Sequence, residues 1–139
     1  MYLRQANLFN GVSMSFIQKV MDIAVSESLP DDAVIFHAGD TALHFFILIN
    51  GRVKLTSGEK MKKVFIGHRA GEFFGWSGLT GRDTYSAAAK CLEPTNFLKI
   101  NCNEFRTLLN SDVSCGQIFY RNLASVLGSR LIEVYELVQ

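Results

Sequence analysis

The first apolar pattern in the chain has the spacing of a helix. Within VSMSFIQKVMDIAVSESL, apolar residues recur at intervals that bring them to one helical face: Phe16, Val20, Ile23 and Ala24. Ser13 or Ser15 precedes them as a candidate N-cap. The pattern predicts a short amphipathic helix over 13–28.

From Pro30 onward, the pattern changes to short β-rich segments that Gly, Pro, Asp or Asn interrupt about every 8–12 residues. The segments are AVIFHAGD, HFFILINGRVKLTSG, KKVFIGHRAGEFFG, YSAAAKCLEP and TNFLKINCNEF. In the second segment, Asn50-Gly51 separates two apolar stretches and has the residue types of a tight turn, which predicts a β-hairpin. The spacing predicts a mainly β unit, a small sandwich or jelly roll, over 30–101.

The last part of the chain returns to helical spacing. Asn103 is a candidate cap, and the pattern predicts helices over 103–138. Apolar residues of the final segment follow a near-heptad order, among them Leu123, Leu127, Leu131 and Val134. At about 1.5 Å per residue, this helix would span roughly 38 Å, which is more than a small barrel needs as a lid. We therefore expect these four residues to form an outer stripe that packs against a second copy of the chain.

Composition narrows the possible functions. The chain of 139 residues is 48% hydrophobic and 19% charged, which suits one domain over 1–139 with a substantial core. Its 14 Lys+Arg and 13 Asp+Glu leave a formal charge of +1, so no broad basic surface is expected to bind nucleic acid. The sequence shows neither a secretion signal nor an apolar run approaching the roughly 18 residues of a membrane span. We expect a cytoplasmic protein that does not enter the membrane.

Metal binding and catalysis are not expected. The three cysteines stand far apart, without the spacing of a metal site or a disulfide framework, and we expect reduced thiols at Cys91, Cys102 and Cys115. A jelly-roll metalloenzyme needs a histidine pair and a carboxylate that converge on one ion, whereas the histidines here are single: His37, His44 and His68. The sequence also lacks a recognisable nucleophile with its base, so we expect no enzyme activity.

The predicted order of elements resembles that of a known family. It consists of a helix, about eight short strands and a long closing helix, with the glycine-rich connection GEFFGWSGLTGRDTYSAAA between two late strands. The chain resembles the cyclic nucleotide-binding domain of the Crp/Fnr (catabolite activator) type over nearly its whole length. The resemblance rests on LFNGVS, VIFHAGDTALHFFILINGRVKL, AGEFFGWSGL and FYRNLASVLGSRL. It implies a double-stranded β-helix (jelly-roll) barrel with an N-terminal helix and a long C-terminal helix.

The resemblance also implies a phosphate-binding loop. In this family a short helix follows a glycine, its free amides receive the cyclic phosphate, an arginine pairs with the phosphate, and a glutamate accepts from the ribose hydroxyl. Gly71 and Gly75 match the two glycine positions, whereas Trp76 stands where the family has glutamate and Tyr85 where it has arginine. The implied ligand-binding residues are Gly75, Trp76, Ser77, Gly78, Leu79, Arg82, Tyr85, Ser86 and Ala87.

Structural roles stay open for several of these residues. Trp76 follows Phe73 and Phe74 and has the residue type that fills space in a core. Arg82 next to Asp83 fits a solvated charge pair, and the types of Tyr85 and Ser86 also fit the start of a strand.

Two functional hypotheses follow. The first is a sensor that holds a cyclic nucleotide or another small anionic ligand against the Gly75–Leu79 backbone and reports it through the terminal helix. Micromolar cAMP binding is not expected, because losing the cation of a buried phosphate site costs about 2–5 kcal/mol; Trp76 and Tyr85 would instead offer a stacking face to the ligand. The second hypothesis is a ligand-free interaction scaffold. Both predict a homodimer through the terminal helix, and no DNA binding is expected, since the helix-turn-helix domain of many relatives has no counterpart before Gln139.

Overall fold

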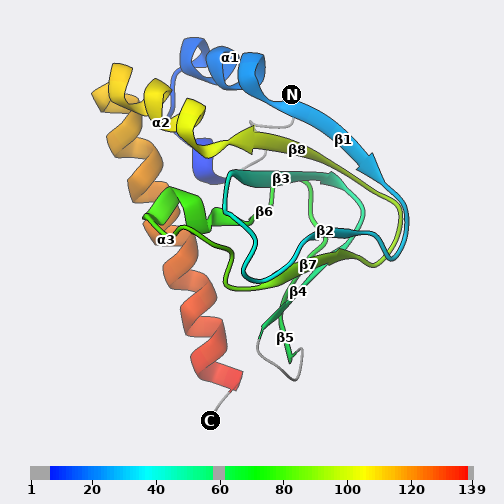
Figure 1. Ribbon diagram of the computed structural model, residues 1–139. Coiled ribbons are helices and arrows are strands. Elements are labelled where there is room, and N and C mark those ends of the chain that lie inside the picture. The colour runs from blue at the N-terminus through cyan, green and yellow to red at the C-terminus, as the bar shows by residue number, and fades with distance from the viewer. Residues whose placement is uncertain (1–6, 58–61, 138–139) are drawn as a thin grey trace.

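The computed structural model describes residues 7–57 and 62–137. Within these residues, two antiparallel sheets of four strands lie one above the other (Figure 1). The first sheet has the order β1 (Val25–Leu29), β8 (Thr95–Asn101), β3 (His44–Asn50) and β6 (Phe73–Phe74). The second has the order β2 (Val34–Phe36), β7 (Ala88–Cys91), β4 (Val53–Ser57) and β5 (Lys62–Gly67). This strand order is that of a jelly roll, so the predicted mainly β fold with flanking helices is confirmed.

The first helix is shorter than predicted. Helix α1 (Met14–Ile23) begins after Ser13, whose Oγ accepts a hydrogen bond from the Phe16 amide at 3.3 Å. It ends at Ile23, and the residues predicted to continue it form β1, which pairs with β8 from Val25↔Lys99 to Leu29↔Thr95. The predicted helix over 13–28 is therefore wrong beyond residue 23. Pairing with β8 satisfies the backbone groups of this segment, which overrides its weak helical pattern.

The predicted β-hairpin at Asn50-Gly51 is also wrong. A turn does occur there, but β3 and β4 lie in different sheets, so the turn carries the chain from one sheet to the other. Gly51 has φ 108°, and a Cβ at this position would lie 2.7 Å from the Cα of Thr95. Glycine is the residue type that fits both the conformation and the close approach.

The core has two parts. The helical core lies between the helices and the first sheet, and its central ring is that of Phe105, with centroids 5.0 Å from Phe45 and 4.8 Å from Phe119. The aromatic core combines residues of both sheets and is built around five rings: Phe36, Phe46, Phe74, Tyr85 and Phe97. These rings fill the space between the two sheets.

Two helices follow the last strand. Helix α2 (Cys102–Ser111) begins after Asn101, whose Oδ1 accepts from the Glu104 amide at 2.9 Å, so the cap is Asn101 and not the predicted Asn103. Helix α3 (Val113–Leu137) follows directly. Residue 138, where the prediction ends the helix, lies outside the described residues. None of the helices in the described part of the chain is long and apolar enough to cross a membrane.

Helix α3 runs down one side of the molecule, and its C-terminal end lies far from α1 and α2 (Figure 1). Its first half belongs to the helical core and packs against the short helix η2 (Asn7–Phe9). Leu123 is 4% exposed and lies inside this core, so the prediction that it belongs to an outer dimer stripe is wrong. Leu127 is half-buried against the same core. Leu131 and Val134 are 49% and 44% exposed, as that stripe requires.

Candidate functional site

The glycine-rich loop contains the short helix that the resemblance implies. The 3-10 helix η3 (Trp76–Thr80) follows Gly75, which has φ 72°. A Cβ on Gly75 would lie 2.8 Å from the Phe46 ring, so the loop begins in direct contact with the aromatic core. Ser77, Gly78 and Leu79 are buried, which places the start of η3 within the protein and not on its surface.

Tyr85 is part of the aromatic core. Its ring is 5% exposed and stacks on Phe36 with a centroid distance of 3.9 Å. Its hydroxyl donates to the carbonyl of His44 at 2.6 Å and accepts from the amide of the same residue at 3.2 Å. The ring expected to stack on a ligand is therefore already packed against the protein and bonded to β3. Burial raises the pKa of Tyr85 to about 12, although the His44 hydrogen bond acts in the opposite direction.

This pKa predicts a loss of stability in alkaline solution. The folded state holds the Tyr85 proton more tightly than the unfolded state, in which the pKa is about 10. The resulting stabilisation is present below about pH 10 and is lost as the pH rises toward 12, by about 2 kcal/mol. Urea unfolding across this pH window measures the free energy of unfolding. The wild type should lose more of it than Tyr85→Phe, because the variant lacks this hydroxyl but keeps the lysines and the other tyrosines that also titrate. Equal losses in both proteins would contradict the buried position of the hydroxyl.

The remaining loop residues divide into a packed group and an exposed group. Trp76 is half-buried and packs against the helical core, as its structural interpretation expects. Arg82 and Ser86 are exposed, and Ala87 is half-buried. Arg82 lines a cavity of about 310 Å³ that also includes Asn103 and Arg106. Arg106 donates to the carbonyl of Gly78 and to Asn103, so α2 holds η3 in place from this side.

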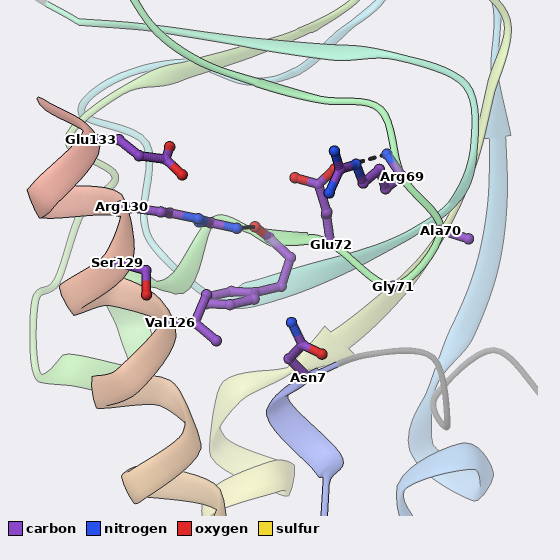
Figure 2. A pocket seen from close by; sticks show the side chains of 10 residues that line it. Asn7, Arg69, Ala70, Gly71, Glu72, Val126, Ser129, Arg130 and Glu133 are labelled. Carbon is purple, nitrogen blue, oxygen red and sulfur yellow. Dashed lines mark hydrogen bonds between the residues drawn. The ribbon is translucent and has the colours of Figure 1, made fainter. Parts of the chain in front are cut away.

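A second hollow, which we call the α3 cleft, lies between α3 and the turn that precedes β6 (Figure 2). Its volume is about 280 Å³. Arg130 and Glu133 extend from α3, whereas Arg69 and Glu72 belong to the turn (Figure 2). Asn7 of η2 lies below them in the same view. The cleft therefore lies between the long helix and the segment that leads into the glycine-rich loop.

Arg130 contacts the opposite side of this cleft. Its Nη2 donates to the carbonyl of Phe73 at 2.9 Å, and its guanidinium carbon lies 4.4 Å from the centroid of the Phe73 ring. Burial lowers the pKa of Arg130, while the nearby carboxylates of Glu72 and Glu133 raise it. Because Phe73 stands two residues before Gly75, this contact ties α3 to the strand from which the loop starts.

The sequence of this chain is similar to that of a known domain family. The model of the cyclic nucleotide-binding domain matches residues 26–112, which is more than half of the chain. The chain belongs to the cyclic nucleotide-binding domain family. The predicted resemblance to the cyclic nucleotide-binding domain is thereby confirmed, and domains of this family are generally regulatory modules.

Solved structures share the fold of this family member. The structure described as that of a cyclic nucleotide-binding protein from Geobacter metallireducens GS-15 is 24% identical, covers 93% of this chain and 95% of its own, and has a TM-score of 0.82. The Thermus thermophilus catabolite activator protein is 21% identical, with 96% and 62% covered and a TM-score of 0.77. The regulatory subunit of a cAMP-independent protein kinase A from Trypanosoma brucei is 15% identical, with 99% and 47% covered and a TM-score of 0.81. No curated protein sequence matches the chain.

The loop has the glycine and the short helix that the resemblance implies, without the two charged side chains that it implies. Gly75 and the short helix after it are present. At the positions that the resemblance assigns to ribose and phosphate binding, the loop has Trp76, which is half-buried against the helical core, and Tyr85, which is buried in the aromatic core. The structure brings Trp76, Ser77 and Leu79 together at η3, while Arg82 and Ser86 remain on the surface.

Other candidate chemistry is sparse in the residues that the structure describes. The three cysteines are free thiols and all are buried. Across 7–57 and 62–137, no group of three or more histidine, cysteine or acidic residues is arranged to hold a metal ion. His37 and His68 are exposed next to Asp40 and Glu72, at 3.5 Å and 3.9 Å respectively.

The α3 cleft was not predicted from the sequence, although one signal for it exists. Phe119, Leu123 and Val126 follow one another at helical spacing on the face of α3 that packs inward. Four residues after Val126, the same row continues with Arg130 instead of an apolar residue. A cation in an inward-facing row indicates a specific partner, but the sequence does not show that the partner is the backbone of Phe73.

Proposed function

We propose that this protein is a non-catalytic regulatory module that binds a small ligand beside the loop of residues 75–87 and reports it through α3. The observation that carries the proposal is the Arg130–Phe73 contact, because it joins the long helix to the strand leading into the loop. A ligand that shifts the loop would change this contact. If the ligand binds more tightly when α3 is in one of two positions, it shifts the equilibrium of the helix toward that position.

The proposed ligand is not cAMP bound in the manner usual for this family. Tyr85 replaces the cation that pairs with the phosphate, and its ring fills space between the sheets. The groups left for a ligand lie at the rim of the loop: Trp76, Arg82 and Ser86. The Trypanosoma brucei structure is described as the regulatory subunit of a cAMP-independent protein kinase A, which supports a role for this fold without cAMP.

Ligand titration tests this function. We expect micromolar cAMP to change neither the fluorescence of Trp76, the single tryptophan, nor the melting temperature, since the missing arginine costs about 2–5 kcal/mol, or tens- to thousands-fold in affinity. In a wider screen of nucleotides and small anions, we expect one ligand to change both signals. At a hundredfold excess over its Kd it should stabilise the fold by about 2.7 kcal/mol. Tight binding of cAMP would contradict the assignment of Tyr85.

The second candidate is a ligand-free scaffold that dimerises through α3. The filled aromatic core favours it, because the rings occupy the space between the sheets. The exposed apolar residues near the end of α3 also favour it: Leu131, Ile132, Val134 and Tyr135. Both candidates include a homodimer, measurable by light scattering. If the protein dimerises and no compound in the screen changes either signal, the scaffold is the correct function.

A further inference from the structure

The α3 cleft carries opposite charges on each of its two walls. The wall formed by α3 has the guanidinium of Arg130 and the carboxylate of Glu133, and the wall formed by the turn has Arg69 and Glu72 (Figure 2). A ligand with one sign of charge would meet as many like charges as opposite ones. A zwitterion, in contrast, can pair its carboxylate with a guanidinium and its ammonium group with a carboxylate.

We propose that the α3 cleft binds a small zwitterion of the free α-amino acid class. The cavity of about 280 Å³ has room for such a molecule. Asn7 and Ser129 also line it and supply neutral hydrogen-bonding groups beside the charges. This site lies outside the loop of residues 75–87, so the inference goes beyond the proposed function and does not depend on it.

Two of the four charged groups are held in place before any ligand arrives. The Arg130 guanidinium is fixed by its hydrogen bond to the Phe73 carbonyl and by the Phe73 ring beneath it. Burial lowers the pKa of this group, while the carboxylates of Glu72 and Glu133 raise it. On the other wall, Glu72 Oε1 accepts from the amides of Arg69 at 2.8 Å and His68 at 3.3 Å. Such preorganisation lowers the entropic cost of binding.

A ligand that contacts both walls would have a mechanical consequence. Arg130 and Glu133 move with α3, whereas Arg69 and Glu72 belong to the jelly roll. A zwitterion bound between them would favour the conformation in which α3 lies against the turn, because the paired charges separate when the helix leaves. The amino acid would therefore favour one position of α3 through a site that is separate from the loop of residues 75–87.

The first test is a thermal-shift screen of the full chain with free L-amino acids at millimolar concentration and constant ionic strength. We expect at least one amino acid to raise the melting temperature. Its deaminated acid and its decarboxylated amine, each carrying half of the zwitterion, should have no effect. If no amino acid stabilises the protein, or if either half stabilises it equally well, the proposal is overturned and the four charges form a surface ion network only.

The second test locates the site by isothermal titration calorimetry of the amino acid that the screen selects. We expect Glu133→Gln and Arg69→Gln each to weaken binding by about tenfold or more, because each removes one charge-assisted hydrogen bond. Both residues are exposed, so the fold should be retained. Glu136→Gln and Arg121→Gln are matched controls on exposed parts of α3 outside the cleft, and both should bind as the wild type does. Unchanged affinity in the two cleft variants would overturn the site.

Discussion

Phe105→Ala is expected to lower the free energy of unfolding by about 3–5 kcal/mol, the range for removing a large ring from a packed core. Phe105 is 0% exposed. Its ring contacts four others from η2, α1, β3 and α3, namely Phe9, Phe16, Phe45 and Phe119. Because these elements meet at one ring, the surrounding side chains cannot close the cavity without moving several helices. Urea unfolding, followed by circular dichroism, measures this loss, and the melting temperature should fall by about 10–17 °C.

The matched control is Ile132→Ala on α3. Ile132 is 58% exposed, so its truncation should change the free energy of unfolding by no more than about 0.5 kcal/mol. A loss below about 1 kcal/mol for Phe105→Ala would mean that the helical core is loosely packed. In that case α3 would not be anchored at its first half, and it would be a poor reporter of events in the loop.

Gly78→Ala is expected to destabilise the protein by about 3 kcal/mol, at the upper end of the usual cost of overpacking. A Cβ at this position would lie 2.4 Å from the carbonyl oxygen of Ala42 and 2.9 Å from Sγ of Cys102. Neither neighbour can move easily, because the Ala42 amide is bonded to Asp83 at 2.8 Å and the Cys102 amide to Leu43 at 2.9 Å. The short helix η3 must therefore shift, which should also change the fluorescence of Trp76.

Gly128→Ala provides the matched control for this substitution. A Cβ on Gly128 would meet nothing within 4 Å, and the residue lies within α3. Alanine should therefore stabilise the helix by about 0.5–1 kcal/mol. If Gly78→Ala were as well tolerated as Gly128→Ala, η3 would be able to move freely, and the loop would be open to a ligand at its amides rather than at its rim.

These two substitutions probe the two ends of the proposed signal. Phe105 anchors the first half of α3, and Gly78 sets the position of the loop between Ala42 and α2. Between them lies the Arg130–Phe73 contact, a hydrogen bond from the second half of α3 to the jelly roll. A change at the loop can reach α3 through this contact only if the loop is rigid and the first half of α3 is held in the core.

Much of the fold follows from periodicity and turn residues. The change from helical spacing to short β-rich segments near residue 30, and the return to helical spacing after residue 101, predicted the jelly roll with flanking helices. The errors occur where local pattern and long-range pairing compete. Val25–Leu29 pairs with β8, which lies some seventy positions later, and the turn at Asn50-Gly51 joins two sheets. Neither pairing is written in the residues next to these segments.

The candidate site shows the same division. From the sequence, the resemblance predicts the glycine positions and places Trp76 and Tyr85 where the family has glutamate and arginine. The orientation of these side chains is not predicted, because an aromatic residue in a loop suits a ligand pocket and a core equally well. For Tyr85 the decision rests on Phe36 and His44, which lie about forty positions and more away.

The sequence by itself determined the fold class, the family and the short helix after Gly75, since these depend on the order of residue types along the chain. Only the tertiary structure decided what that loop faces. In the folded protein the Tyr85 ring lies between the sheets and Leu123 lies in the core. Arg130 contacts Phe73, which is fifty-seven positions away in the sequence. The physical reason is that a side chain is buried, or finds its partner, only when segments far apart in the sequence pack together. The local sequence limits which residues can be buried but does not specify what they contact.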